Sequence, residues 1–188
     1  MFYRVVRFIV KILVYVVYRP KIYGKENKIE KGRVVVVANH KNNFDCAFLA
    51  VIFKRTLHFL AKDELTTGKL GWAFRRMQVI PVNRREKDHN AIPMAVKHLN
   101  KDEGVAIFPE GTFNKTDKLI MDFKIGAVKM AHDSDSYILP VALVSNYKLS
   151  WKRFVIRIGK PYKIESDDLE KENKKLMKKV TDLLKEGE

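Results

Sequence analysis

Short apolar runs alternate with segments of helical periodicity from residue 33 onward. The apolar runs are rich in β-branched residues and predict strands at 33–38, 57–61, 77–82, 104–108, 137–144 and 154–158. Segments in which apolar residues recur every three or four positions predict helices at 44–54, 70–76, 91–100, 125–132 and 167–184. Such alternation is typical of an α/β fold, so we expect a mixed, largely parallel sheet flanked by helices.

The strand expected at 33–38 contains four consecutive valines at 34–37, which indicates a strand covered on both faces. The sequence shows no internal repeat, low-complexity linker or Gly/Ser-rich boundary. We therefore expect two parts, a helix over 1–20 and one compact domain over 21–188. Ser166 is the expected N-cap of the C-terminal helix.

Residues 2–18 form a dense apolar segment that also carries Arg4, Arg7 and Lys11 at helical spacing. Because most of its apolar residues lie away from this cationic stripe, the segment predicts an amphipathic helix on a membrane surface. Its uninterrupted apolar run is too short for a membrane span, and Arg19-Pro20 replaces the small residues of a secretory cleavage site. The alternative is a β-branched strand or a helix packed on the rest of the protein.

The net charge and the cysteine content limit the range of possible functions further. The 188 residues include 37 Lys and Arg against 22 Asp and Glu, a formal net charge of +15. This excess indicates an anionic partner: nucleic acid, an acidic lipid surface or a phosphorylated substrate. The single cysteine, Cys46, excludes an internal disulfide framework and fits a reducing, cytoplasmic setting. No cofactor motif is present, and the five histidines show no metal-ligand spacing, so no metal site is predicted.

The first candidate chemical group follows the strand expected at 33–38. His40 lies in the predicted loop, and Asp45 lies in the first turn of the next predicted helix. The two side chains meet only if the chain folds back, since a continuous helix would place them about 140° apart. In that arrangement the Asp45 carboxylate would hold one imidazole nitrogen and make the other a general base. The alternative is a surface histidine near a capping aspartate.

Three further groups follow predicted strands. Glu110, Gly111 and Thr112 form a turn that can cradle a polar head group, while Arg84 and Lys62 can bind phosphate. Read singly, each has an ordinary structural alternative: a Pro-Glu-Gly turn for the first and solvated cations for the other two.

The order and spacing of these groups resemble the glycerophospholipid acyltransferase family, which includes the 1-acylglycerol-3-phosphate acyltransferase called PlsC in bacteria. Four blocks over about residues 22–159 carry the resemblance: Asn39-His40 with Asp45, the segment 79–84, the segment 108–112 and the segment 138–142. The resemblance implies a glycerol-3-phosphate acyltransferase-like fold. It also implies that His40 is the general base and that Asp45 orients it. Substrate would be bound by Lys62, Arg84, Glu110, Gly111 and Thr112.

Two positions depart from the family pattern. Many members have Arg and then Ser after the Glu-Gly-Thr block, where this chain has Phe113 and Asn114, with Lys115 next. Many also have Ser two residues after the catalytic histidine, where this chain has Asn42. Loss of an arginine with five fixed donors bears on the head group of the acceptor more than on the chemistry.

The resemblance implies transfer of a fatty acyl group from acyl-CoA or acyl carrier protein to the free hydroxyl of a lysophospholipid. The expected acceptor is 1-acyl-sn-glycerol-3-phosphate and the product phosphatidic acid. His40 would remove the hydroxyl proton without a covalent intermediate, and Cys46 is not expected to act as a nucleophile. The anionic partner is then a membrane surface, with the enzyme peripheral or monotopic on its cytoplasmic face.

Three alternatives remain open at this stage. The charge clusters at 75–76, 84–85 and 171–179 suggest a nucleic-acid-binding module, although no recognition motif accompanies them. Phe113 suggests another lysophospholipid or an amine-bearing lipid as acceptor. A non-catalytic membrane adaptor is the third.

Overall fold

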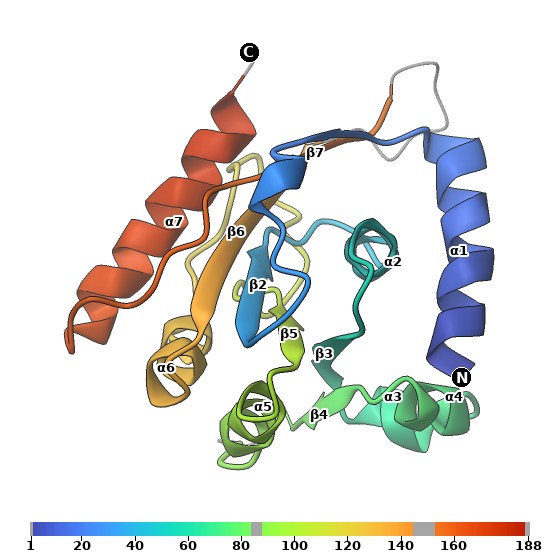
Figure 1. The fold of residues 1–188 in the computed structure, drawn as a ribbon, viewed down its shortest axis with the longest axis horizontal. Coiled ribbons are helices and arrows are strands. Elements are labelled where there is room, and N and C mark those ends of the chain that lie inside the picture. The colour runs from blue at the N-terminus through green and yellow to red at the C-terminus, as the bar shows by residue number, and fades with distance from the viewer. Residues whose placement is uncertain (1, 84–87, 145–152, 187–188) are drawn as a thin grey trace.

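The computed structural model describes residues 2–83, 88–144 and 153–186, and Figure 1 shows their arrangement. Seven strands form one sheet in the order β1-β7-β6-β2-β5-β3-β4. The strands are β1 (Lys21–Tyr23), β2 (Val34–Ala38), β3 (Leu57–Lys62), β4 (Ile80–Val82), β5 (Gly104–Ile107), β6 (Tyr137–Val144) and β7 (Val155–Ile158). All neighbours are parallel except β6 and β7, which confirms the expected mixed, largely parallel sheet.

Helices cover both faces of this sheet (Figure 1). They are α1 (Phe2–Tyr18), α2 (Asp45–Ile52), α3 (Glu64–Thr67), α4 (Gly71–Arg76), α5 (Ala91–Leu99), α6 (Gly126–Asp133) and α7 (Leu169–Lys185), with a 3₁₀ turn η1 (Lys25–Asn27). One core lies between the sheet and α2, and the other lies between the sheet and α5, α6 and α7. The two cores stabilise the sheet from opposite sides.

The valines of β2 divide between these cores. Val34 and Val36 belong to the core under α2, whereas Val35 and Val37 belong to the core under α5 to α7. All four are fully buried, which confirms the expectation of a strand covered on both faces. Each contributes about 1.5–3 kcal/mol by its burial. The loop that follows this central strand is therefore anchored on a rigid base.

The strand register brings four loops to one end of the sheet. Val37 of β2 pairs with Ile107 of β5, and Phe59 of β3 pairs with Ala106. Because β2, β5, β3 and β4 all run in the same direction, their carboxyl ends meet at one edge. We call this the carboxyl edge of the sheet.

Helix α1 packs along α2, with Val14 buried and Val10 and Tyr18 partly buried in the same core. The Arg7 Nη1 donates hydrogen bonds to the carbonyl oxygens of Phe53, at 3.0 Å, and of Lys54, just past the last turn of α2. The expected helix is present, and one of its sides packs on the domain, as the alternative interpretation proposed. Within the described residues, no helix has the length and apolar content to cross a membrane.

The opposite side of α1 is apolar and exposed. Its outward side chains are Val5, Phe8, Ile9, Ile12, Leu13 and Val16, each about half exposed or more. Leu65, Leu70 and Trp72 of the α3–α4 segment are also exposed, and the Phe2 ring lies 5.5 Å from the Trp72 ring. Figure 1 shows α3 and α4 beside the N-terminal end of α1, so the two apolar surfaces adjoin. We call them together the α1 apolar face.

Some element boundaries differ from the expectations. The strand expected at 77–82 begins only at Ile80, because Gln78 has a φ of 57° and interrupts extended backbone. The N-cap of α7 is Asp168, whose side chain accepts from the Lys171 N–H, and Ser166 instead accepts from the Asp168 N–H. The sequence pattern did not predict β1, a three-residue strand held by pairing with β7.

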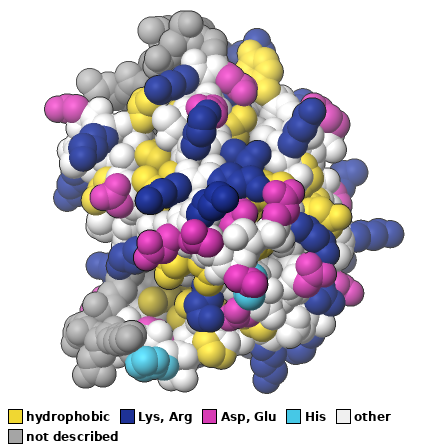
Figure 2. Space-filling model, turned by 90° about the vertical axis from the view of Figure 1, so that its left-hand side faces the viewer, with side chains coloured by type: hydrophobic (Ala, Val, Ile, Leu, Met, Phe, Trp, Pro, Cys, Tyr) yellow, Lys and Arg dark blue, Asp and Glu magenta, His cyan; other side chains and the backbone are white. Residues whose placement is uncertain are grey.

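The charge on α7 is mixed rather than uniformly basic. Figure 2, which faces this side of the molecule, shows Asp and Glu interspersed among Lys and Arg. Lys175 pairs with Glu165 at 2.9 Å and Lys178 with Asp182 at 2.8 Å. The lysine cluster at 171–179 therefore lies on a surface where acidic groups interrupt the positive field.

Candidate active site

His40 and Asp45 meet at the carboxyl edge of β2. The chain folds back after Ala38, and His40 Nδ1 lies 2.8 Å from Asp45 Oδ2. The same oxygen accepts the N–H groups of Lys41 at 2.8 Å and Asn42 at 2.9 Å. Asp45 is fully buried, and the His40 side chain is 12% exposed. The predicted pairing is thus formed, and backbone donors hold the carboxylate in place.

The backbone of His40 is fixed on both sides. Its N–H donates to Glu110 Oε1 at 2.7 Å, and its carbonyl accepts the N–H of Asn114 at 2.7 Å. The second Glu110 oxygen accepts the N–H of Met121 at 2.8 Å. Burial of this carboxyl raises its pKa, against the lowering effect of the two N–H groups. Glu110 therefore anchors the histidine loop to the segment that follows β5.

Two phenylalanines hold the imidazole ring. The Phe108 ring stacks on it with centroids 4.0 Å apart and an interplanar angle of 11°, and the Phe113 ring lies 4.4 Å away at 55°. With Nδ1–H donated to Asp45, Nε2 keeps its lone pair. Among the described residues, Nε2 has no protein hydrogen-bond partner. The site therefore presents one fixed basic nitrogen.

Asn39 is a structural residue to which the sequence analysis gave no separate role. Its side chain is fully buried, donates to the Leu143 carbonyl at 3.1 Å and accepts the Leu143 N–H at 2.8 Å. These paired bonds join the end of β2 to the end of β6. The only signal in the sequence was a polar residue directly after an apolar strand.

Gly111, Thr112 and Lys62, three of the other predicted binding residues, lie at the same edge. Gly111 has a φ of 71° and its N–H donates to the Phe108 carbonyl, so glycine suits this turn. Thr112 is exposed beside it, and Lys62 is exposed at the end of β3. Arg84, which follows β4, lies outside the described residues.

Lys124 is a cation that the sequence analysis missed. Its Nζ lies 3.0 Å from the position a Cβ on Gly111 would take, and its N–H donates to the Pro109 carbonyl. The side chain therefore covers the Gly111 turn and brings a positive charge to it. Lys124 and Gly111 are 13 positions apart, and nothing in the sequence pattern predicted their contact.

Cys46 directly follows Asp45 in α2. Burial, and secondarily the negative charge of Asp45, raises the pKa of its thiol to about 12. The thiol therefore stays protonated at neutral pH.

Cys46 lines an apolar cavity of about 180 Å³ between α1, α2 and β3. The other lining residues are Tyr3, Val6, Arg7, Val10, Ala47, Ala50, Phe59, Met77 and Val79. Cys46 and Ala47 place one part of this cavity beside the first turn of α2, the helix that also carries Asp45. Its lining suits a hydrocarbon chain.

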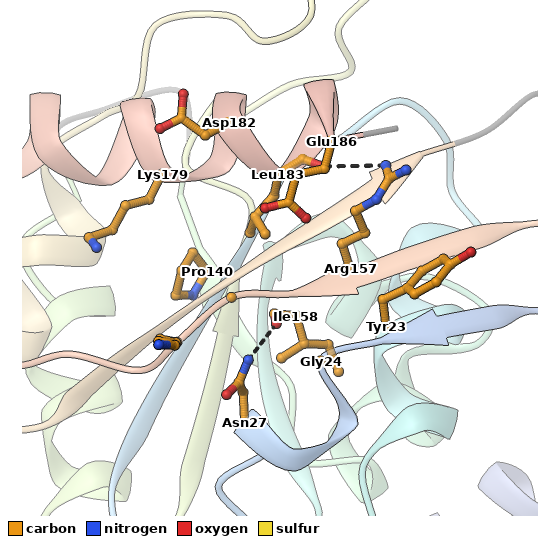
Figure 3. Close-up of a pocket in the computed structure, with 12 residues that line it drawn as sticks. Tyr23, Gly24, Asn27, Pro140, Arg157, Ile158, Lys179, Asp182, Leu183 and Glu186 are labelled. Atoms are coloured by element: carbon orange, nitrogen blue, oxygen red, sulfur yellow. Dashed lines mark hydrogen bonds between the residues drawn. The ribbon is translucent and has the colours of Figure 1, made fainter. Parts of the chain in front are cut away.

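A larger hollow of about 430 Å³ lies between α7, β7 and the β1–η1 turn (Figure 3). Arg157 donates to the Leu183 carbonyl there, and the Asn27 amide donates to the Ile158 carbonyl. These polar groups serve the contacts between elements. The hollow contains none of the predicted site residues, so we assign the chemistry to the His40 edge.

Comparison with known proteins identifies the family of the chain. Residues 19–144 match the family model described as Acyltransferase, and the chain belongs to that family. It is 32% identical to the 1-acyl-sn-glycerol-3-phosphate acyltransferase of Bacillus subtilis over 65% of this chain and 61% of the relative. It is 27% identical to the enzyme of the same name in Saccharomyces cerevisiae over 88% of this chain and 60% of the relative.

The crystal structure of the 1-acyl-sn-glycerophosphate (LPA) acyltransferase PlsC from Thermotoga maritima has the same fold. The TM-score is 0.77 at 20% identity, over 96% of this chain and 79% of the other. The chain spans about half to three-fifths of the length of the first curated relatives it matches. The family and the fold expected from the sequence are thus confirmed.

Proposed function

We propose that this protein transfers a fatty acyl group from a thioester to the free hydroxyl of 1-acyl-sn-glycerol-3-phosphate. The observation that carries the proposal is the 2.8 Å contact between His40 Nδ1 and Asp45 Oδ2, in a loop fixed at both backbone groups of the histidine. Relatives bearing the name of that activity support the choice of substrate.

The proposed reaction uses the lone pair of His40 Nε2 as a general base. This nitrogen removes the proton from the acceptor hydroxyl as its oxygen attacks the thioester carbonyl carbon. The carbonyl becomes an oxyanion, while the buried Asp45 carboxylate stabilises the imidazolium. Collapse re-forms the carbonyl, breaks the carbon–sulfur bond and returns the proton to the leaving thiolate. No covalent enzyme intermediate is required.

The acceptor phosphate is placed at the carboxyl edge beside the Gly111 turn. Lys62 and the exposed Thr112 lie at this edge, Lys124 covers the turn, and Arg84 is assigned here from its place after β4. Cations and a hydroxyl suit a phosphate monoester. Phe113 holds the His40 ring instead of offering a guanidinium. Lys124 supplies positive charge in the same turn.

The acyl chain is placed in the apolar cavity beside Cys46. The cavity reaches from the active-site end of α2 to the inner side of α1, and burial of methylene groups there favours binding by about 0.8 kcal/mol each. Both acyl-CoA and acyl carrier protein present such a chain as a thioester. The proposed acyl donor is therefore either acyl-CoA or acyl carrier protein, which carry the same reactive thioester.

The α1 apolar face is assigned to the cytoplasmic surface of an anionic membrane. Six half-exposed apolar side chains on one helix, with Trp72 beside them, form a surface of the kind that enters the lipid interface. Arg4 and Lys11, both exposed on this helix, would face anionic head groups. The lipid-borne acceptor then reaches the site from the membrane.

The test is release of free thiol from an acyl-CoA in mixed micelles, with and without lysophosphatidate. We expect acceptor-dependent release by the wild type and its loss in His40→Ala, with unchanged circular dichroism. His89→Ala, which changes an exposed histidine, is the matched control. Acceptor-dependent release that persists in His40→Ala would refute the proposed mechanism.

Further experiments test the identity of the acceptor and of the acyl donor. A panel of lysophospholipids and amine-bearing lipids tests the acceptor, and Lys124→Gln should raise KM for lysophosphatidate more than it lowers kcat. Lys129→Gln, on the exposed side of α6, is the control for the change in charge. Acyl carrier protein replaces CoA in a parallel assay, and failure of both donors with every acceptor would favour the adaptor interpretation.

A further inference from the structure

Three metal-ligating side chains meet at the end of the sheet opposite the carboxyl edge. His58 is the second residue of β3, His98 lies in the last turn of α5, and Glu103 directly precedes β5. A ligand atom from each lies within 4.8 Å of the other two. Two of these residues are 40 positions apart in sequence, so spacing along the chain gave no sign of this cluster. We call it the His58 cluster.

The shortest distances converge on one carboxylate oxygen. Glu103 Oε2 lies 3.2 Å from His58 Nε2 and 2.6 Å from His98 Nδ1. The two imidazole rings lie face to face, with centroids 4.0 Å apart and an interplanar angle of 25°. All three ligand atoms therefore lie within one small volume.

The hydrogen bond made by His58 Nδ1 determines which nitrogen of this ring can bind a metal. His58 Nδ1 lies 3.0 Å from the Gln78 carbonyl oxygen, which can only accept a hydrogen bond, so Nδ1 carries the hydrogen. In the neutral ring, Nε2 then directs its lone pair at Glu103. Histidines that bind metals commonly donate one ring N–H to a backbone carbonyl and bind the metal through the other nitrogen. His58 has this arrangement.

We propose that the His58 cluster binds a divalent transition metal, with Zn²⁺ as the ion that suits it. Two imidazoles and a carboxylate are common ligands of Zn²⁺, and tetrahedral coordination needs ligand atoms about 3.3 Å apart. The His58–Glu103 distance already matches this value. The His98–Glu103 distance must increase. Both side chains have room to move, since the His98 side chain is 25% exposed and the Glu103 side chain 40% exposed.

The surroundings allow entry of the ion. His58, Gln78 and Glu103 line an open cavity of about 540 Å³ that gives access to the cluster. Arg55 lines the same cavity, but its guanidinium donates to the carbonyls of Gly32 at 2.6 Å and Asp102 at 2.7 Å. Water in this cavity would fill the fourth coordination position.

The bound ion would act on stability rather than on the acyl transfer. It would join the start of β3 to the turn between α5 and β5, which are two separate parts of the chain. Ligands that bind only the folded state stabilise it in proportion to the logarithm of their concentration. The inference is independent of the proposed function, because none of its residues lies at the carboxyl edge.

The experiment is titration of chelator-treated, full-length protein with Zn²⁺, read by calorimetry and by competition with a chromophoric chelator. Binding of Co²⁺, read from its visible absorption, reports the coordination number. The variants are His98→Ala and Glu103→Gln, both of partly exposed residues, so that folding is preserved. His89→Ala, an exposed histidine outside the cluster, is the matched control.

We expect one Zn²⁺ per chain, an increase in Tm on binding, and a loss of affinity of at least about tenfold in each ligand variant. The intense visible band of four-coordinate Co²⁺ should disappear in the same variants and persist in His89→Ala. Absence of binding at micromolar Zn²⁺, or equal binding by all the proteins, would show that the cluster is a hydrogen-bonded network only.

Discussion

The backbone N–H of His40 donates a 2.7 Å hydrogen bond to Oε1 of Glu110, a residue 70 positions later in the chain. The carboxylate spans the loops after β2 and β5, because its other oxygen accepts the N–H of Met121. This contact explains how a loop histidine keeps one orientation. It also separates two roles, since a residue that holds the base need not touch the substrate.

Glu110→Gln should therefore lower kcat with little change in KM for the acceptor. The amide keeps one oxygen acceptor but replaces the other with a donor, which leaves one backbone N–H unsatisfied at a cost of about 1–3 kcal/mol. Steady-state kinetics and thermal unfolding measure the two effects. Glu170→Gln, on the exposed first turn of α7, is the control. A variant that raised KM alone would instead indicate a direct phosphate contact.

Asp45→Asn should reduce kcat by up to about 10⁴-fold, the loss found when the carboxylate of a serine protease triad is made an amide. The amide can still accept the N–H groups of Lys41 and Asn42, so the loop should keep its shape. The amide is neutral, so it would not stabilise the imidazolium that forms on His40. Thiol release measures the effect, with the exposed Asp117→Asn as control. A rate within tenfold of wild type would remove Asp45 from the mechanism.

Cys46 should resist alkylation in the native protein. A thiol whose pKa is raised to about 12 is deprotonated to only about 10⁻⁴ at pH 8, since ionisation falls tenfold for each pH unit below the pKa. The labelling rate with iodoacetamide, followed by mass spectrometry from pH 7 to 10, should rise with pH throughout. Labelling in denaturant gives the reference rate.

Cys46→Ala complements this measurement, because it removes the thiol and leaves the His40–Asp45 pair in place. It should retain nearly full kcat. Rapid alkylation at pH 7, or a catalytically dead Cys46→Ala variant that is folded, would reopen a covalent mechanism.

The α1 apolar face should bind anionic vesicles. In a Trp151→Phe background, Trp72 is the sole tryptophan, and its fluorescence should shift to shorter wavelength as the face enters the lipid. Ile12→Asp should weaken binding by about tenfold or more, because burial of one such side chain is worth about 1.5–3 kcal/mol. Sedimentation with vesicles gives the affinity.

Lys174→Gln, an exposed change on α7, is the control with the same change in net charge as Ile12→Asp. Equal weakening by the two variants would point to general electrostatics. Deletion of residues 1–18 with retained vesicle affinity would contradict the assignment of this face.

The periodicity of the sequence determined the class of fold. Four consecutive valines in β2 report burial on both faces, because alternate strand residues face opposite sides. Strand and helix periods are properties of neighbouring residues, so they can be read without the fold. His40 and Asp45 lie only five positions apart after a strand end, so their contact could be proposed from the sequence, and the structure forms it.

Only the tertiary structure decided which distant groups meet at each end of the sheet. Asn114 reaches the His40 carbonyl, Lys124 covers the Gly111 turn, and His98 stacks on His58. These contacts depend on strand order and register, which are set by packing across the whole sheet rather than by local periodicity. The same packing made α1 two-sided, with one apolar side buried on α2 and the other left exposed.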